Sequence, residues 1–222
     1  MRFFLVAFLS IGTASVVAEP AARTIVLVRH GHYAADPKAD PKLGPGLSAL
    51  GVAQARIVGA RLAGEALAFE VFASPLTRAQ ETARVIADDL GNSSIKNVAD
   101  LAECTPPTRR SEATAGMESA DLDDCAAQLD RLYAVYFKPA EDQASHQLLI
   151  CHGNVIRYLI TKALGVDTKA WLELSVGHTS LTTIRIEADG RMQLIGAGDV
   201  GHLPPNLRTG ASGNPERVLG VP

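Results

Sequence analysis

The chain has 222 residues, of which 20% are charged and 5% are aromatic, and its formal net charge is −3 at pH 7. This length fits one domain of ordinary size with a full hydrophobic core. The slightly negative charge and the few aromatic side chains argue against nucleic acid as a partner, because such sites need basic surfaces and rings on which bases stack.

The first 18 residues have the pattern of a secretory signal peptide. Arg2 supplies a positive charge, an apolar stretch follows, and Val16-Val17-Ala18 resembles a signal-peptidase site. The apolar stretch is shorter than the about 20 residues that span a bilayer. We therefore expect cleavage after Ala18, export to the periplasm or the medium, and no stable membrane association of a single mature domain over residues 19–222. An uncleaved segment, acting as a membrane anchor, is the alternative.

The first predicted strand, residues 24–28, ends in Arg29, His30 and Gly31. Its nearly continuous apolar residues indicate a strand that is buried on both faces of a parallel sheet. Parallel sheets hold ligands at the carboxyl ends of their strands, so the cationic pair lies where a site is expected. Gly31 would let the backbone approach a ligand closely. A basic pair that merely ends a strand is the alternative, and the loop over residues 33–46 should border the site.

Arg78 lies in a second element in which a strand leads into a helix. A helix capped by Ser48 comes first, and residues 69–73 then predict a strand. Ser74 is expected to cap the next helix, which runs to about residue 90. Arg78 then lies in the first helical turn, where free N–H groups and the helix dipole favour an anion. An arginine that only faces solvent is the alternative.

The middle of the chain supplies a carboxylate and two cysteines. A weaker strand is expected over residues 95–98, and Glu103 and Cys104 follow it at the start of a loop with few apolar residues. A helix over residues 121–138 carries Cys125. In an oxidising compartment Cys104 and Cys125 could form a disulfide, although sequence does not give the connectivity.

A further strand, residues 147–151, repeats the pattern of the first. It is apolar, it ends in His152 and Gly153, and a helix over residues 155–164 follows. A core histidine with satisfied hydrogen bonds is the alternative interpretation of His152, and Cys151 is expected to be a buried free thiol.

The remaining chain predicts a β-hairpin and a tail. Residues 181–187 and 191–195 predict two strands, which an Asp-Gly turn joins into a hairpin. The irregular tail, from about residue 200, is expected to be partly disordered.

Two arginines and two histidines, Arg29, Arg78, His30 and His152, are therefore expected to converge. Arginine forks suit phosphate oxygens, and two of them can neutralise a phosphoryl group. A neutral imidazole can attack phosphorus and carry the phosphoryl group, and a carboxylic acid can protonate the leaving alkoxide. The sequence has no nucleotide-binding glycine loop and no serine-nucleophile motif. A zinc site that includes His32 is disfavoured, because the arginines would repel the cation.

The sequence resembles the histidine phosphatases of the phosphoglycerate mutase type over about residues 23–199. The motifs that carry the resemblance are Arg29-His30-Gly31, Ser74-Pro75-Leu76-Thr77-Arg78-Ala79-Gln80-Glu81-Thr82, Leu101-Ala102-Glu103 and Cys151-His152-Gly153-Asn154. Similarity to the mitochondrial serine/threonine protein phosphatases within this family extends to further segments, Leu47-Ser48-Ala49-Leu50-Gly51 and Trp171-Leu172-Glu173-Leu174-Ser175.

The resemblance implies an α/β fold, a three-layer sandwich with a mixed, mainly parallel sheet and helices on both faces. It implies that His30 is the phosphoryl acceptor and that Glu103 is the proton donor. Arg29, Arg78 and His152 would form the phosphate pocket. His152 would also take part in catalysis. No cofactor and no metal are implied.

Three further residues are possible members of the site: Asp36, Asn154 and His178. Many members of the family have an asparagine at the position of Asp36. An ionised aspartate cannot donate a hydrogen bond and would repel phosphate, which puts a direct contact by Asp36 in doubt.

We therefore expect a metal-independent phosphomonoesterase that acts through a phosphohistidine on phosphoserine or phosphothreonine peptides or on small phosphate monoesters. A phosphoglycerate-type mutase is one alternative, but the segment after Glu103 is short for an insertion that closes over a small substrate. A catalytically silent module that binds phosphorylated ligands is the other, and the intact set of candidate residues argues against it.

Overall fold

A computed structural model gives the structure of residues 19–92 and 94–210. Within these residues six strands form one mixed sheet in the order β3-β2-β4-β1-β5-β6. The strands are β1 (Arg23–Arg29), β2 (Phe69–Ala73), β3 (Ile95–Asn97), β4 (Ser145–Cys151), β5 (Leu181–Ile186) and β6 (Met192–Asp199). Strands β1 to β4 run parallel, β5 is antiparallel to β1, and β6 is antiparallel to β5. This is the mixed, mainly parallel sheet that the sequence predicted.

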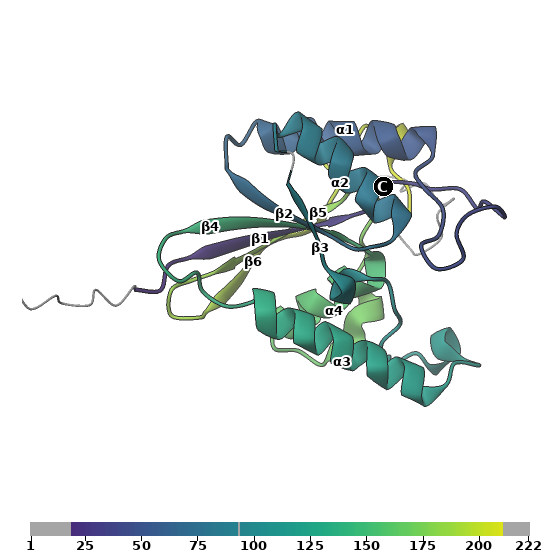
Figure 1. The fold of residues 1–222 in the computed structure, drawn as a ribbon. Coiled ribbons are helices and arrows are strands. Elements are labelled where there is room, and N and C mark those ends of the chain that lie inside the picture. The colour runs from purple at the N-terminus through teal and green to yellow at the C-terminus, as the bar shows by residue number, and fades with distance from the viewer. Residues whose placement is uncertain (1–18, 93, 211–222) are drawn as a thin grey trace, which may run out of the picture.

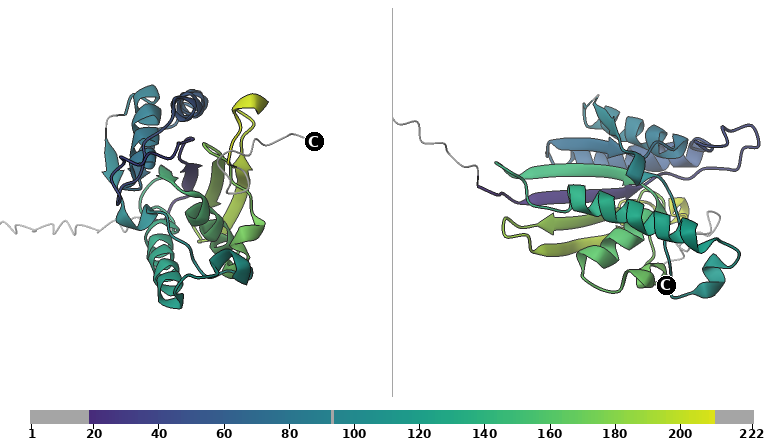
Figure 2. Two further views of the ribbon diagram at one scale, coloured as in Figure 1. Left: turned by 90° about the vertical axis from the view of Figure 1, so that its right-hand side faces the viewer. Right: turned by 60° about the horizontal axis from the view of Figure 1, so that its bottom comes forward.

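Helices cover both faces of the sheet (Figures 1 and 2). One face carries α1 (Ala49–Ala63) and α2 (Thr77–Asp89), and the other carries α3 (Ser119–Tyr136) and α4 (Gly153–Ala163). Short 3-10 helices lie at Ala99–Leu101, Ser111–Thr114, Thr168–Glu173 and Pro205–Leu207. None of the helices in the described part of the chain is long and apolar enough to cross a membrane.

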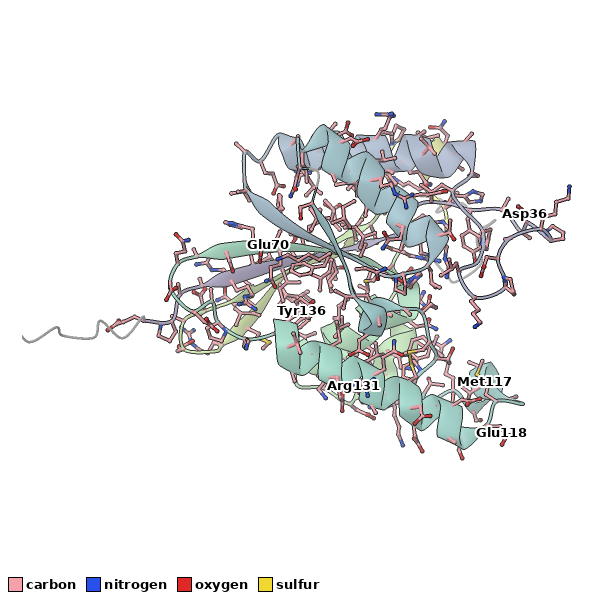
Figure 3. The ribbon with its side chains drawn as sticks, viewed as in Figure 1. Asp36, Glu70, Met117, Glu118, Arg131 and Tyr136 are labelled. Carbon is pink, nitrogen blue, oxygen red and sulfur yellow. A yellow bond between two sulfur atoms is a disulfide. The ribbon has the colours of Figure 1, made fainter. Side chains whose placement is uncertain are left out.

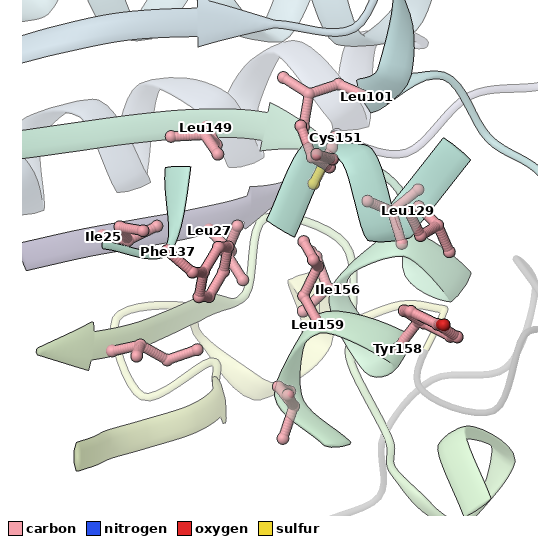
Figure 4. Packing of buried hydrophobic residues seen from close by; sticks show 14 of the residues in the cluster. Ile25, Leu27, Leu101, Leu129, Phe137, Leu149, Cys151, Ile156, Tyr158 and Leu159 are labelled. Atoms are coloured by element: carbon pink, nitrogen blue, oxygen red, sulfur yellow. The ribbon is translucent and has the colours of Figure 1, made fainter. Parts of the chain in front are cut away.

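Helices bury both faces of the sheet at β1, which explains why this strand is apolar without interruption. Successive side chains of a strand point to opposite faces. Val26 and Val28 pack in the cluster under α1 and α2, whereas Ile25 and Leu27 pack in the cluster toward α3 and α4 (Figure 4). Because both faces are buried, β1 needs an apolar residue at every central position, as the sequence indicated.

The helix starts agree with expectation at Ser48 and differ at Ser74. The Ser48 side chain accepts a hydrogen bond from the Gly51 backbone and caps α1. Helix α2 begins only at Thr77 and has no side-chain cap. Ser74 lies two residues before the N-cap residue Leu76, so the expected cap was wrong, although the Ser74 hydroxyl accepts a hydrogen bond of 3.3 Å from the Leu76 backbone.

Gly31 is required by packing between backbones. A Cβ atom at Gly31 would lie 2.6 Å from the carbonyl oxygen of Gly51, and one at Gly51 would overlap the carbonyl oxygen of His32. The end of β1 therefore contacts the first turn of α1 directly. The sequence analysis expected Gly31 to let the backbone approach a ligand. In the structure the backbone at Gly31 closely approaches α1 instead.

Residues 203–210, here called the C-terminal strap, return to the end of β1. Leu203 is 1% exposed and Thr209 is 6% exposed. The backbone of Leu207 accepts a hydrogen bond of 2.6 Å from the side chain of Gln54 in α1. The tail is irregular, as predicted, and this part of it packs against the sheet and α1. Its remainder, residues 211–222, lies outside the described residues, as does the expected signal peptide.

A disulfide joins Cys104 to Cys125 in α3. It fixes the segment that carries Glu103 to the helix layer. Cys151 is a buried free thiol at the end of β4, in agreement with the sequence prediction.

Candidate active site

The carboxyl ends of β2, β4 and β1 lie side by side, and the chain beyond each of them carries a candidate residue. The ring centroids of His30 and His152 are 5.0 Å apart. Nε of Arg78 lies 3.2 Å from Nε2 of His30. The structure therefore brings together the side chains whose convergence the strand pattern predicted.

His30 is buried, and its hydrogen bonds fix its tautomer. Nδ1 lies 2.8 Å from the carbonyl oxygen of Gly31, which can only accept, so Nδ1 carries the proton. Nε2 then holds a lone pair and accepts from Arg78. Burial is the main cause that holds the pKa of His30 well below its usual range, and the neighbouring His152 and Arg29 add to the shift. The ring is thus a neutral imidazole with a lone pair, the form that can act as a nucleophile.

The guanidinium of Arg29 spans the end of β1 and the C-terminal strap. Its Nη1 donates to the carbonyl oxygens of Val176 at 2.8 Å and Gly210 at 2.6 Å. Burial lowers the pKa of Arg29 to about 10, so the group is still cationic at neutral pH. A fixed positive charge therefore lies at the carboxyl end of β1, beside His30.

Arg78 approaches from the first turn of α2, as predicted. Its guanidinium lies 5.0 Å from the ring centroid of Tyr33, an arrangement that permits a cation–π interaction. The hydroxyl of Thr82 donates to the backbone oxygen of Arg78 at 2.6 Å and accepts from the Gly31 backbone at 3.0 Å. Helix α2 and the end of β1 are thus fixed relative to each other.

His152 lies at the end of β4, where it is the N-cap residue of α4. Its Nε2 is 2.7 Å from Oγ of Ser74, which sequence analysis assigned to a helix cap. Burial lowers the pKa of His152 well below its usual range, so this ring is also neutral. Its Nδ1 has no hydrogen-bond partner among the described residues.

Glu103 faces the arginines from the segment after β3. Its Oε1 accepts a hydrogen bond of 3.3 Å from the backbone of Asn154. Burial raises the pKa of Glu103, although Arg29 and Arg78 oppose the shift. The Asn154 side chain donates to the Cys104 carbonyl at 3.1 Å. Asn154 therefore holds the Glu103 segment in place, and the raised pKa favours a protonated carboxyl.

Asp36 does not reach the site. It lies exposed in the loop that follows β1, far out on the molecule (Figure 3). Its Oδ1 accepts a hydrogen bond of 2.9 Å from the backbone of Lys38. The aspartate stabilises its own turn. In this structure Asp36 is therefore not among the residues that come together at the candidate site.

His178 does reach the site. It is fully buried, and its ring centroid is 5.3 Å from that of His30. Its Nδ1 is 2.9 Å from Oγ1 of Thr209 in the C-terminal strap. Burial, aided by the charge of Arg29, lowers the pKa of His178 to about 2.

Sequence reasoning missed several residues of the site: Tyr33, Gln54, Ser74, Arg157 and Thr209. Arg157, on α4, is buried, and its charge lowers the pKa of Glu103. A usable signal existed for it, because it follows the His-Gly-Asn motif by one helical turn. No such signal existed for Gln54 and Thr209, which meet across 155 residues of sequence.

Four buried nitrogen atoms in this region lack a hydrogen-bond partner among the described residues: Nε of Arg29, Nδ1 of His152, Nε of Arg157 and Nε2 of His178. Buried polar atoms without partners are unfavourable, so an anion that accepts from such groups is favoured there. Within the same described residues, no group of three or more His, Cys, Asp or Glu side chains is arranged to hold a metal ion.

The profile of the histidine phosphatase superfamily (branch 1) matches residues 25–196. The mitochondrial serine/threonine-protein phosphatase Pgam5 of Caenorhabditis elegans is 34% identical over 192 residues, which are 84% of this chain and 66% of the relative. The protein of the same name in Drosophila grimshawi is 34% identical over 195 residues, 85% of this chain and 67% of the relative. The chain thus spans just under two thirds of the length of the C. elegans protein.

Solved structures share the fold. Phosphoglycerate mutase from Plasmodium falciparum has a TM-score of 0.57 and 27% identity, with 83% of this chain and 95% of that chain covered. The alpha-ribazole phosphatase of Shigella flexneri has a TM-score of 0.62 and 18% identity, covering 79% of this chain and 96% of that chain. With the profile match over most of its length, the chain belongs to branch 1 of the histidine phosphatase superfamily.

Proposed function

We propose that the protein is a metal-independent phosphomonoesterase that works through a phosphohistidine on His30. One observation carries the proposal. The uncharged Nε2 of His30 faces Arg78, in a region with several unpartnered buried N–H groups. A nucleophile and an anion site thus occupy the same place.

In the first step Arg29, Arg78 and His152 bind the phosphoryl oxygens. The Nε–H of Arg78, which now donates to Nε2 of His30, donates to a phosphoryl oxygen and frees the lone pair. Nε2 attacks phosphorus as the bond to the leaving oxygen breaks, and the carboxylic acid of Glu103 gives that oxygen its proton.

In the second step the ionised Glu103 takes a proton from water, and the water oxygen attacks phosphorus. The bond between phosphorus and Nε2 breaks, which releases inorganic phosphate and restores neutral His30. Glu103 leaves this step protonated and ready for the next turnover.

The surroundings favour a monoester with an exposed phosphate, such as a phosphoserine or phosphothreonine peptide. Arg109 and Arg110 could have bound a second phosphate, but they pair with Asp167 at 2.9 Å and Glu173 at 2.8 Å. The similarity to relatives that are named serine/threonine phosphatases supports the same substrate class.

We further propose that the enzyme acts outside the cytoplasm, after cleavage following Ala18. The N-terminal sequence pattern supports this location, as does a disulfide between Cys104 and Cys125. Mass spectrometry of protein recovered from the periplasm or the medium should give Glu19 as the first residue. A chain that keeps residues 1–18 in the membrane fraction contradicts cleavage.

Trapping the intermediate tests the catalytic proposal. The protein should hydrolyse p-nitrophenyl phosphate in the presence of EDTA, with a burst of product. Rapid quenching with a radiolabelled phosphopeptide should leave acid-labile, base-stable label on His30. His30→Ala should lose activity by a factor on the order of 10³ or more and carry no label.

His146→Ala is the matched control, because His146 lies at the opposite end of β4. It should keep its activity and its label. Label on another residue, or turnover that EDTA abolishes, would overturn the mechanism.

A further inference from the structure

We propose that His178 is a further catalytic residue, which donates a hydrogen bond from Nε2–H to the transferred phosphoryl group, and that Gln54 and Thr209 position it. The inference rests on the proposed phosphatase function. It assigns a role to a buried histidine that the two-step mechanism does not use.

A chain of hydrogen bonds sets the direction of every donor. The backbone N–H of His32 can only donate, and it donates to Oε1 of Gln54 at 2.8 Å. The amide of Gln54 is thereby oriented. Its Nε2 donates to the Leu207 carbonyl at 2.6 Å and to Oγ1 of Thr209 at 3.0 Å.

The hydroxyl of Thr209 therefore accepts from Gln54 and still has one hydrogen to donate. Nδ1 of His178 lies 2.9 Å away and is the one hydrogen-bond acceptor for it among the described residues. A hydroxyl that donates to Nδ1 requires this nitrogen to be unprotonated. Since burial keeps the ring neutral, its proton is on Nε2.

The Nε2–H of His178 is buried and has no partner in the described part of the chain. A histidine that served only the core would have both ring nitrogens satisfied. The ring lies beside that of His30, at 5.3 Å between centroids. A phosphoryl group bound at His30 would bring an oxygen acceptor to this donor.

The backbone next to His178 is strained, which independently indicates a functional position. Thr179 has φ of 51°, a conformation that is rare for a β-branched residue. Its backbone N–H donates to the Arg29 carbonyl at 3.0 Å, and its hydroxyl donates to the His178 carbonyl at 2.8 Å. This geometry holds His178 against the end of β1.

The C-terminal strap encloses the same ring from the other side. A Cβ atom at Gly210 would lie 2.7 Å from Nδ1 of His178, and Arg29 donates to the carbonyl of Gly210. The strap thus has a physical role in the site, because it supplies the hydroxyl that fixes the tautomer and leaves Nε2–H as the donor.

NMR of the full chain with ¹⁵N-labelled histidine tests the tautomer directly. His178 should be protonated at Nε2 and unprotonated at Nδ1 at neutral pH. Orthovanadate, used as the phosphoryl probe, should shift the Nε2–H resonance. A proton on Nδ1, or a resonance that saturating orthovanadate leaves unchanged, would overturn the inference.

Kinetics with p-nitrophenyl phosphate test the role. Thr209→Val keeps the shape of the side chain but removes the hydroxyl, so we expect kcat/KM to fall by about tenfold and the Nδ1–H tautomer to appear. Thr209→Ser should restore both. His178→Ala should lose a factor on the order of 10² if it folds, and His146→Gln, remote from the site, should match wild type.

The outcomes separate the two proposals. If wild type fails to turn over phosphate monoesters, the proposed function is wrong. If wild type is active and Thr209→Val has wild-type kcat/KM and the same tautomer, the role of His178 is wrong and the phosphatase mechanism stands.

Discussion

In the proposed mechanism Glu103 needs two protonation states during one turnover, and its environment is suited to both. Burial raises its pKa, whereas Arg29, Arg78 and Arg157 keep the ionised form accessible. Because the acid form must protonate the leaving oxygen, the rate with a poor leaving group should fall as pH rises through this raised pKa.

Glu103→Gln removes the proton donor while keeping the shape of the side chain. We expect turnover of a phosphoserine peptide to fall by a factor on the order of 10² or more, because its alkoxide needs a proton. Turnover of p-nitrophenyl phosphate should fall much less, and its alkaline decline should flatten. Glu112→Gln, in an exposed 3-10 helix, is the control. An equal loss on both substrates would assign Glu103 a structural role.

The sequence predicted the reactive residues better than it predicted their partners. Arg29, His30 and His152 follow strands of strong apolar pattern, and the ends of neighbouring parallel strands must meet. The structure places Asp36 outside the group of converging residues, where its side chain accepts a hydrogen bond from the Lys38 backbone. The contact of Thr209 with His178 depends on the path by which the irregular C-terminal strap returns to the sheet. Hydrophobic periodicity predicts helices and strands but not the path of an irregular segment.

The contact between the end of β1 and the first turn of α1 joins the strand that leads into His30 to the helices that cover one face of the sheet. Gly51 lies against the carbonyl of His32, so Gly51→Ala must push α1 away from the strand end. We expect the free energy of unfolding to fall by about 1–3 kcal/mol. Activity should fall as well, since α1 carries Gln54.

Urea unfolding of Gly51→Ala and Gly64→Ala measures this contact. Gly64 caps the other end of α1 with a helical φ of −66°, and a Cβ there would keep 3.4 Å from its nearest neighbour. Gly64→Ala should therefore be neutral within about 0.5 kcal/mol. Equal stability of the two variants would mean that the strand end tolerates a shift of the helix.

The disulfide links the loop that bears Glu103 to α3. It closes a separation of 21 residues, so the chain-entropy model predicts a stabilisation of roughly 3 kcal/mol. Reductant should lower the free energy of unfolding of wild type by about this amount and leave a Cys104→Ala/Cys125→Ala variant unchanged. The buried Cys151 should not contribute. Free thiols at both positions in exported, non-reduced protein would contradict the pairing.

Strands and helices followed the sequence closely where the periodicity was strong. The prediction of residues 69–73 matches β2, and the predicted hairpin is formed by β5 and β6. The start of α2 was missed because the helix begins two residues later than expected, and the Ser74 hydroxyl bonds His152 as well as the Leu76 backbone. A local capping rule cannot account for a partner that comes from another strand.

At the scale of the whole molecule, the start of the described chain lies far from the candidate active site. The described chain enters at the amino end of β1, whereas the site lies at the carboxyl ends of the parallel strands (Figure 1). The start of the described chain and the candidate site therefore lie at opposite ends of the sheet.

Three buried histidines, His30, His152 and His178, make the stability of the whole fold depend on pH. Burial lowers the pKa of each below that of an exposed histidine. As pH falls below about 6.5, the unfolded chain binds protons that the folded chain does not, so the free energy of unfolding must decrease. Each histidine contributes a slope approaching about 1.4 kcal/mol per pH unit.

Urea unfolding between about pH 7.5 and about pH 5.5 measures this slope before most carboxylates titrate. Wild type should lose stability steadily toward acid pH. His178→Gln should have a slope that is smaller by about 1.4 kcal/mol per pH unit at the acid end. A free energy of unfolding that stays constant over this range would show that the buried histidines accept protons in the folded state, and a nucleophile protonated in that way could not form the phosphohistidine.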